Sequence, residues 1–278
     1  MADAGKKVDE EGGDHKMKIS VVEKKDNISK FLIEDTNFSE MNLLRRTIMF
    51  EVPVIAIEDV YFTKNSSPLY DEIIAQRLGL IPLSTDLKTY NLPEVCKCKG
   101  KGCSACQVKL SVSISGPATV YAKDMKTTDS QIKPIYPNMI ITKLGNGQEL
   151  AFEAVAVLGK GSTHMKWSPA LAYYINKPSV KIDQNKVKSK VKQIIDACPS
   201  NVFELKSGKL TINKDILLKN NLATEQARYV SEKFEGITFE EDETKFILTI
   251  ESWGQLTSLE ILKNATQIMK EQLSAVKI

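Results

Sequence analysis

The sequence predicts an α+β fold. Between about residues 53 and 177, runs of β-branched and aromatic residues are separated by Gly, Pro and Asn, as expected of strands and turns. Near the two ends of the chain, segments 38–53 and 257–278 carry apolar residues spaced by three and four, the pattern of amphipathic helices. With 278 residues, the chain is long enough for two compact domains, or for one domain that carries insertions.

The composition excludes several classes of protein. Hydrophobic residues make up 42% and charged residues 26%, so a sizeable core is expected and global disorder is not. The formal net charge of +3 is too balanced to indicate nucleic acid or an anionic membrane by itself. Residues 1–16 are polar and lack an apolar core, which predicts a flexible tail and not a signal peptide. Because no run approaches the roughly 18 apolar residues of a membrane span, we expect a cytoplasmic protein.

The first folded segment is expected to contain two strands and a helix. Residues 19–35 predict two strands around a polar turn at 25–27. In 38–53, apolar residues that share one helical face are Met41, Leu44 and Ile48. Ser39 is expected to cap this helix, and Pro53 lies just beyond its end.

The helix that closes the chain is marked by its start and by an apolar seam. Thr257 and Glu260 form a capping-box pattern. The seam recurs every three or four residues through Leu262, Ala265, Met269, Leu273 and Val276. Its mean spacing of about 3.5 residues is typical of helix-on-helix packing. Such a helix can pack on its own sheet or against another chain, and the pattern alone favours its own sheet.

The composition of the chain changes at Pro178. Before it, strands are expected in VIAIEDVYF, KLSVSISGPATVYA, PNMIITKL and ELAFEAVAVLG, and DEIIAQRLGLIPL is expected to be helical up to Gly79. After it comes a lysine-rich run at 181–192. VFEL and KLTI are then expected to form a hairpin around Ser207 and Gly208, ATEQARYVSEKF a helix and KFILTIESWG a strand.

Four of the five cysteines lie in one short loop with the spacing C-x-C-x4-C-x2-C: Cys96, Cys98, Cys103 and Cys106. Four thiolates in a short loop suit tetrahedral zinc, and because protein fills all four positions the metal would be structural and not catalytic. Gly100 and Gly102 allow the backbone to turn between the two pairs. Lys97, Lys99 and Lys101 would offset part of the negative charge of the thiolates.

The alternatives for this loop are four free thiols, intramolecular disulfides or an iron–sulfur cluster. A reducing compartment disfavours disulfides, and a C-x-C pair in one loop fits a cluster less well than zinc. The loop also lacks the histidines and the helix of a groove-reading zinc finger. Elsewhere, Cys198 before Pro199 indicates a buried thiol at a helix end. The only histidines are His15 and His164, and His164 lies in GKGSTHMKWSP, which is either an exposed partner contact or a solvated turn.

Several motifs, in the same order along the chain, resemble the α-like subunits of multisubunit RNA polymerases. They are the helix with Leu-Arg-Arg before Val-Pro in FSEMNLLRRTIMFEVPVIAIEDV, the following DEIIAQRLGLIPL, the loop AVLGKGSTHMKWSPA and the closing TSLEILKNATQIMKEQL. DACPSNVFELKSGKLTI resembles half of a ferredoxin repeat, an insert that archaeal members of this family carry. The cysteine loop resembles the zinc loop of the eukaryotic counterpart in RNA polymerase II. The resemblance covers roughly residue 19 to the end.

The resemblance implies a discontinuous dimerisation domain with two inserts. Residues 17–52 and 235–278 would form the dimerisation domain, 53–177 an inserted mostly-β domain with the zinc loop, and 178–234 a small ferredoxin-like insert. Members with a cluster supply several cysteines in this insert, whereas only Cys198 remains here. Since one thiolate cannot hold a cluster, we expect one structural zinc ion and no iron–sulfur cluster.

The resemblance also implies a non-catalytic assembly role in DNA-directed transcription. The two helices of the dimerisation domain would pack against the small subunit L. This implication replaces the expectation, drawn from the pattern alone, that the closing helix packs on the chain's own sheet. The apolar residues expected at that contact are Leu44, Ile48, Leu262, Ala265, Met269 and Leu273. The resulting heterodimer would carry the large catalytic subunits and other small subunits, with DNA reached only indirectly. Further partner contacts would come from Arg45 and Arg46, for which the alternative is a solvated position on the helix face. His164, Lys166 and Trp167 would add contacts from their loop.

The residues by themselves leave two other functions open. One is an electron carrier that uses the ferredoxin-like region, against which the single cysteine of that region argues. The other is a free-standing zinc-containing nucleic-acid binder that uses the lysine run 181–192, which tight and salt-dependent duplex binding would indicate. No motif of an enzyme active site is found in the chain.

Overall fold

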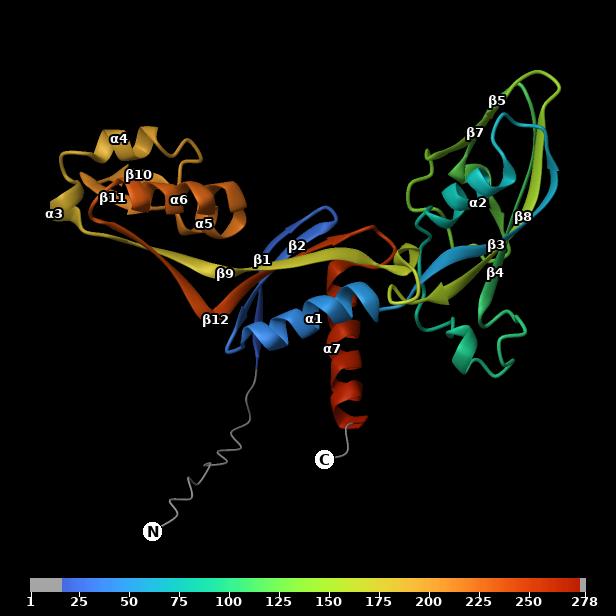
Figure 1. Cartoon of the computed structure of the whole chain (residues 1–278), viewed down its shortest axis with the longest axis horizontal. Helices are drawn as coiled ribbons and strands as arrows, with labels where there is room; N and C mark the ends of the chain where they lie inside the picture. The colour runs from blue at the N-terminus through green and yellow to red at the C-terminus, as the bar shows by residue number, and fades with distance from the viewer. Residues whose placement is uncertain (1–16, 276–278) are drawn as a thin grey trace, which may run out of the picture. The chain divides into compact units, whose positions relative to one another are not determined.

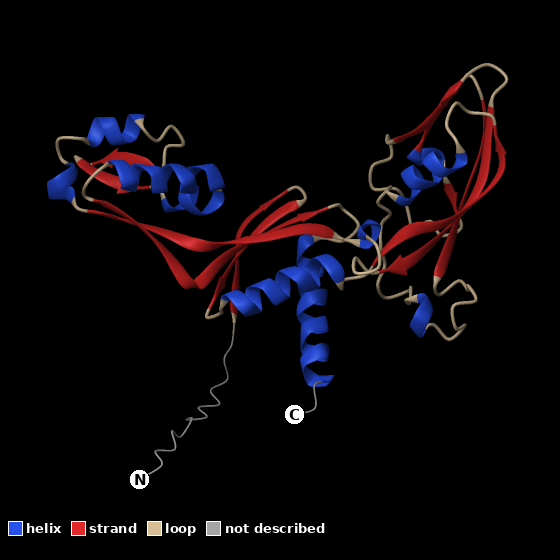
Figure 2. Ribbon diagram, in the orientation of Figure 1, coloured by secondary structure: helices blue, strands red, loops and turns tan. Residues whose placement is uncertain are grey.

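The computed structural model describes residues 17–275 of the chain (Figures 1 and 2). It is a mixed α+β fold with several antiparallel sheets, which confirms the predicted class. The expected tail at 1–16 and the seam residue Val276 lie outside the described residues. Two compact units are distinguished: the first contains 17–22, 31–38 and 175–247, and the second contains 23–30, 39–174 and 248–275. Among the described residues, no helix has both the length and the apolar character needed to cross a membrane.

One four-stranded sheet has the order β1-β2-β12-β9. Its strands are β1 (Lys18–Lys25), β2 (Ile28–Glu34), β12 (Ile237–Ser252) and β9 (Ala170–Ile182). The predicted pair of strands around 25–27 is confirmed, and Asp26 in that turn has a φ of 47°, the left-handed conformation that Asp tolerates better than most residues. Strand β9 was not predicted, and β12 begins well before the expected residue 245.

The second unit is built around a sheet of order β3-β8-β4-β6, in which neighbours are antiparallel. Its strands are β3 (Val54–Asn65), β8 (Glu149–Gly159), β4 (Gln107–Ser115) and β6 (Lys126–Thr127), and β5 (Ala118–Tyr121) pairs with β7 (Ile140–Leu144) in a smaller sheet. Every second residue of β8 from Leu150 to Leu158 is buried, the period of a strand with one core face. Helix α2 (Asp71–Gly79) adds Ile74 and Leu78 to the same core.

Two longer helices also belong to the second unit, α1 (Phe38–Phe50) from its second residue onward and α7 (Ser258–Ala275). The predicted face of α1 is confirmed, since all three of its apolar residues are fully buried. The prediction that Ser39 caps α1 is wrong, because the helix already begins at Phe38, whose ring packs edge-on against Phe246 with centroids 5.1 Å apart. The capping box of α7 is confirmed: Thr257 N donates to Glu260 Oε2 at 2.9 Å, and Glu260 N donates to Thr257 Oγ1 at 3.3 Å.

The residues between β9 and β12 form the small folded part of the first unit. Its elements are α3 (Gln184–Val187), α4 (Val191–Asp196), β10 (Phe203–Lys206), β11 (Lys209–Ile212), α5 (Lys214–Lys219) and α6 (Asn221–Lys233). The predicted hairpin is confirmed, and its two turn residues, Ser207 and Gly208, have φ values of 52° and 74°. A type I′ turn requires a positive φ at both of these positions.

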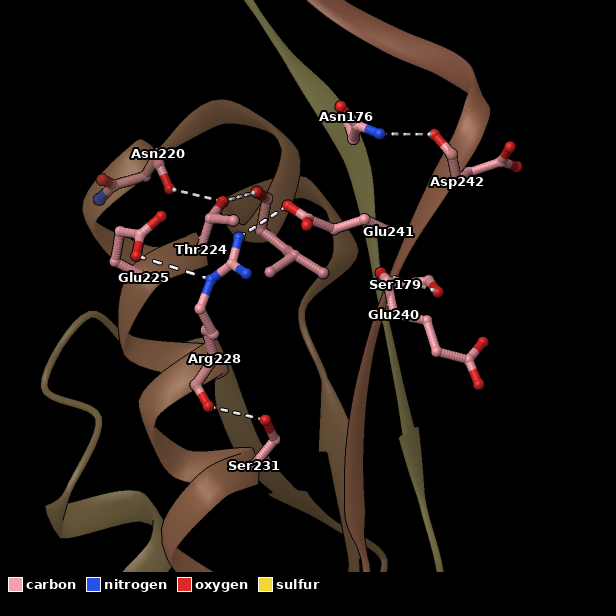
Figure 3. Close-up of polar contacts among 11 residues, drawn as sticks. Asn176, Ser179, Asn220, Thr224, Glu225, Arg228, Ser231, Glu240, Glu241 and Asp242 are labelled. Carbon is pink, nitrogen blue, oxygen red and sulfur yellow. Dashed lines mark hydrogen bonds and ion pairs between the residues drawn. The ribbon is translucent and has the colours of Figure 1, made fainter.

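Helix α6 is tied to strand β12 by one arginine (Figure 3). Arg228 Nη2 donates to Glu241 at 2.7 Å, and its guanidinium lies 4.7 Å from the centroid of the Phe239 ring. Beside this contact, the side chain of Asn176 on β9 donates to the carbonyl of Asp242 on β12 at 3.4 Å. Because an exposed ion pair alone contributes little, the position of the guanidinium over the Phe239 ring adds a cation–π attraction to this contact.

A close approach at the end of β8 fixes the position of one buried tryptophan. Trp167 is 6% exposed, and its indole Nε1 donates to the carbonyl of Val157 at 3.2 Å. A Cβ atom added to Gly159 would lie 2.3 Å from the Trp167 ring. Only glycine therefore allows the ring to lie against this strand.

Gly159→Ala is expected to lower the free energy of unfolding by about 2 kcal/mol, because the extra methyl group forces the ring or the strand to move. In a protein of this size that corresponds to a fall in Tm of roughly 4–8 °C, measured by thermal melts. The matched control is Gly79→Ala, where the added Cβ meets the carbonyl of Ile57 at an ordinary 3.5 Å. Equal Tm values for the two variants would contradict the packing argument.

Candidate metal centre and partner-binding helices

The four cysteine sulfurs predicted to bind metal lie together. The Sγ atoms of Cys96 and Cys103 are 3.6 Å apart, those of Cys98 and Cys106 3.5 Å, and those of Cys103 and Cys106 3.7 Å. All four sulfurs lie within 4.8 Å of one another. A single ion bound tetrahedrally by four thiolates at ~2.3 Å would hold them about 3.8 Å apart. The four residues thus fit one metal ion.

The local backbone of the loop brings the two cysteine pairs together. A short 3-10 helix, η1 (Pro93–Val95), leads into Cys96, and Cys106 directly precedes β4. Between them, Lys99, Gly100 and Gly102 have φ values of 53°, 77° and 84°. Two of these three positions are glycine, for which the left-handed conformation costs nothing. The chain can therefore reverse twice within seven residues, Cys96 to Gly102, and face its sulfurs inward.

The thiols of this loop differ in acidity because they hydrogen-bond to one another. Burial opposes ionisation of Cys98, but hydrogen bonds from Cys106, Cys96 and Cys103 lower the pKa of its thiol to about 6. Burial raises the pKa of the Cys106 thiol to about 12. Because thiol ligands lose their protons when a divalent cation binds, a lowered thiol pKa in the loop favours metal binding.

The geometry is unlike the other arrangements considered for four cysteines. A disulfide would bring two sulfurs to about 2.05 Å, far below the observed separations. Four sulfurs that all lie within 4.8 Å of one another fit around a single ion and leave no space for the several iron atoms of a cluster. The three lysines of the loop are exposed and lie within two residues of a cysteine in the sequence, so their positive charge would offset part of the negative charge of several thiolates.

The segment before the cysteine loop is held to the body of the second unit by a tyrosine. The hydroxyl of Tyr90 donates to Asp129 Oδ2 at 2.5 Å, and the next residue, Asn91, donates its N–H to the carbonyl of Ala105 at 2.8 Å. Burial and the hydrogen bond to Asp129 raise the pKa of Tyr90. The same hydrogen bond, with that from the N–H of Gln131, lowers the pKa of Asp129. No signal in the sequence indicates this pair, because the two residues are 39 positions apart.

Tyr90→Phe is expected to lower the free energy of unfolding at pH 7 by about 1 kcal/mol, since Asp129 is partly exposed and regains water when the hydrogen bond is lost. The pKa of Asp129 is depressed in the folded chain, so the stability it supplies is present above its unfolded pKa and is lost as the pH falls. The difference in unfolding free energy between wild type and variant should thus stay constant from pH 7 to about pH 5 and narrow as the pH falls further, through the unfolded pKa of about 4 towards the lower folded pKa. Urea unfolding of wild type and variant at each pH measures this difference in unfolding free energy. A difference that does not change with pH would contradict the assigned hydrogen bond from Tyr90 to Asp129.

On α1, the two apolar residues predicted for the partner face are buried inside this chain, and the two arginines differ. Leu44 and Ile48 are fully buried. Arg45 donates to Asn42 Oδ1 at 2.9 Å through Nη2. Arg46 is exposed, and its guanidinium lies 6.0 Å from the centroid of the Phe50 ring. The exposed guanidinium of Arg46 is therefore the one more available to another molecule.

The seam of α7 passes from the core to the surface. Leu262 and Ala265 are buried, Met269 is half-buried, and Leu273 is 63% exposed. A groove of about 450 Å³ lies along this outer half and is lined by Leu44, Thr266, Met269, Lys270, Leu273 and Ser274. Only the first half of the seam is thus covered by this chain, and the second half remains an apolar groove.

The loop with the predicted partner contacts His164, Lys166 and Trp167 is held against its own chain. Lys166 Nζ forms an ion pair with Glu58, donates to the carbonyl of Ile57 at 3.0 Å and lies 4.4 Å from the centroid of the Trp167 ring. His164 is exposed, and its Nδ1 accepts the N–H of Lys166 at 3.1 Å. These contacts order the loop, and a partner role for the three residues stays a prediction.

The remaining candidates of the first unit are a lone thiol and a set of lysines. Cys198 is 1% exposed in the core beyond α4, which confirms the prediction of a buried thiol at a helix end. Within the run 181–192, Lys181 pairs with a glutamate of β12 at 2.7 Å, and Lys186 pairs with Glu235 at 2.9 Å. Two lysines of the run are therefore already engaged by acidic side chains of the same unit.

Comparisons with known proteins agree with the fold and the site. A family model described as RNA polymerase Rpb3/RpoA insert domain matches residues 56–172, which include the cysteine loop. DNA-directed RNA polymerase subunit Rpo3 of Methanopyrus kandleri is 33% identical over 89% of this chain and 89% of its own length. The Rpo3 subunits of Methanosphaera stadtmanae and Methanosarcina mazei are each 34% identical, over 92% and 94% of this chain and 96% and 98% of their own lengths.

These relatives span nearly the whole chain at more than 30% identity, and the matched insert domain coincides with the main sheet of the second unit. The chain therefore belongs to the family of the archaeal DNA-directed RNA polymerase subunit Rpo3.

Proposed function

We propose that this chain is the non-catalytic assembly subunit of a DNA-dependent RNA polymerase, and that it pairs with the small subunit L to form the platform for the large catalytic subunits. The observation that carries this proposal is the groove along α1 and α7, where the seam of α7 leaves the core and Leu273 is exposed. Apolar helix faces of this kind are stabilised by a second helix that covers them.

The domain organisation proposed for this role follows the predicted boundaries. Residues 17–52 and 235–278 would form the dimerisation domain, which supplies both α1 and α7. Residues 53–177 would be an inserted mostly-β domain, and 178–234 a ferredoxin-like insert whose single cysteine is buried in its core. The exposed Arg46 is proposed to contact a large subunit, because a guanidinium fork suits polar recognition at an interface.

The metal of the cysteine loop is proposed to be zinc. The four sulfurs surround one position at the separations of a tetrahedral site, and thiolates are soft ligands that zinc accepts without redox chemistry. A filled tetrahedron leaves no open position for a substrate, so the ion would stabilise the loop between η1 and β4 and take no part in a reaction.

The decisive experiment is native mass spectrometry of the chain co-expressed with subunit L. A one-to-one complex, with one zinc ion per complex, is the expected result. Absence of the complex, when both chains are present and folded, would overturn the dimerisation proposal. Metal content measured on the same sample is independent of dimerisation, so the two parts of the proposal are tested separately.

A further inference from the structure

A second apolar pocket in the second unit is distinct from the groove on α1 and α7. Its volume is about 440 Å³, and it lies among the turn after α2, the 136–139 segment, the loop before β9 and the turn after β12. Six large apolar residues at this pocket are each between 37% and 55% exposed: Leu80, Tyr136, Met139, Met165, Leu171 and Trp253. We call these six residues and the space between them the Met–Trp pocket.

The walls of the Met–Trp pocket are held in place by backbone hydrogen bonds between segments that are distant in sequence. Ile135 N donates to the carbonyl of Pro82 at 2.9 Å, and Trp253 N donates to the carbonyl of Pro169 at 3.1 Å. A Cβ added to Gly254 would lie 2.6 Å from the Ile135 side chain, so the turn after β12 packs closely on this wall. The pocket is therefore already formed in the free chain.

The charges around the pocket favour an uncharged occupant. Among the described residues that line it, Lys166 is the only charged side chain. Its ammonium group is neutralised by the ion pair with Glu58 and is also hydrogen-bonded to the carbonyl of Ile57. A charged group would lose its hydration in this apolar space without gaining a partner.

One buried acceptor in the lining has no hydrogen-bond partner among the described residues. Gln255 lines the pocket and is 5% exposed, and its Oε1 is unpaired. Its Nε2 donates to the carbonyl of Ile55 at 3.4 Å. Because a carbonyl can only accept, this contact fixes the orientation of the amide and leaves the oxygen free. A buried acceptor of this kind favours a ligand that brings an N–H or O–H donor.

We propose that the Met–Trp pocket receives a large uncharged side chain with an N–H donor, of the tryptophan type, from a segment of another polymerase subunit. Contiguous exposed apolar residues mark protein contacts, and methionine, tyrosine and tryptophan are enriched in interface cores. The thioether side chains of Met139 and Met165 are flexible, so they can move aside and let the donor reach Gln255. The identity of the partner as a polymerase subunit rests on the proposed function.

The first test uses indole as the probe and indene as its matched control, which has a similar shape but no N–H. Spectra of the full chain with labelled methionine methyl groups are recorded during each titration. Indole is expected to shift the Met139 and Met165 signals, to leave that of Met17 unchanged, and to bind about three- to tenfold more tightly than indene, the range of one hydrogen bond. Equal affinities, or no shift at either methionine, would overturn the proposal.

Gln255→Leu provides the variant for this test, because it removes the acceptor while keeping a similar volume. It is expected to reduce the affinity for indole to that for indene, with little change in Tm. A Tm loss accompanied by unchanged indole preference would mean that Gln255 is only structural, which contradicts its assigned role. Gln131→Leu, the same change at an exposed glutamine outside the pocket, is the control that should keep the indole preference.

The second test locates the partner in the assembled enzyme. Peroxide oxidation of Met139 and Met165 should be at least about fivefold slower in the polymerase than in the free chain, because the partner side chain covers them. Equal oxidation in both, or protection in a homodimer of this chain, would overturn the inference. Failure of the complex with subunit L would instead contradict the proposed function, and the indole comparison would still decide whether the pocket binds such a group.

Discussion

Replacing Cys103 by serine is expected to release zinc from the chain and to destabilise the loop between η1 and β4. The Sγ of Cys103 touches those of Cys96 and Cys106, so its loss opens one side of the tetrahedron. A serine hydroxyl is a poor replacement, because it is neither a soft ligand nor ionised near neutral pH. We expect less than about a tenth of the wild-type zinc to remain after dialysis against a weak chelator, measured by plasma mass spectrometry.

The control for this change is Cys198→Ser, which alters the fifth cysteine of the same chain. Cys198 lies in the first unit, and its thiol contacts Ser200 Oγ at 3.4 Å and Gln226 Oε1 at 3.6 Å, neither of which is part of the cysteine loop. The zinc content of Cys198→Ser should equal that of wild type, although the substitution disturbs the core of the first unit. Retention of a full zinc ion by Cys103→Ser, or loss of zinc from Cys198→Ser, would contradict the assigned ligand set.

The cluster of four cysteine sulfurs could be predicted from the sequence because all of its determinants are local. The four cysteines and both glycines of the turn fall within eleven residues, so spacing alone decides which sulfurs can meet. The capping box of α7 was predicted for the same reason, since Thr257 and Glu260 are three residues apart. Local signals of this kind do not depend on how the rest of the chain folds.

Strand β9 was missed because its sequence contains signals that usually end a strand. Pro178 lies within it and cannot donate a hydrogen bond to a neighbouring strand. The sheet order β1-β2-β12-β9 resolves the conflict, because β9 is an edge strand and an edge position tolerates proline. The first half of β12 was missed for a related reason: ITFEEDET is rich in acidic residues, which are depleted in strands unless they face solvent.

Contacts between distant residues could not be predicted from one sequence. The mixture of basic and aromatic residues in GKGSTHMKWSP predicts an exposed loop. In the structure, however, Trp167 is buried against Gly159. That burial depends on β8 passing directly beneath the ring, a property of the three-dimensional packing. The hydrogen bond from Tyr90 to Asp129 and the unpaired oxygen of Gln255 are likewise visible only in the folded chain.

Leu273→Arg is expected to weaken the complex with subunit L about 10- to 100-fold while leaving the isolated chain folded. Leu273 is 63% exposed in the free chain, so the substitution removes little of its own core. In the complex, the same side chain would be buried, and burying a leucine contributes about 1.5–3 kcal/mol. The arginine forfeits this contribution and adds the cost of covering a charge, and each ~1.4 kcal/mol changes Kd tenfold.

The control is Gln267→Arg, which places the same charge on the same helix. Gln267 is exposed and lies about 120° around α7 from Leu273, away from the seam, where its side chain donates to Glu271 at 2.7 Å. An arginine there can pair with Glu271, so Kd should stay within about threefold of wild type. Kd is measured by titration calorimetry and the Tm of each free variant by circular dichroism. Equal affinities for the two variants would place the contact with subunit L elsewhere, since both carry the same charge and only one removes an apolar side chain from the groove.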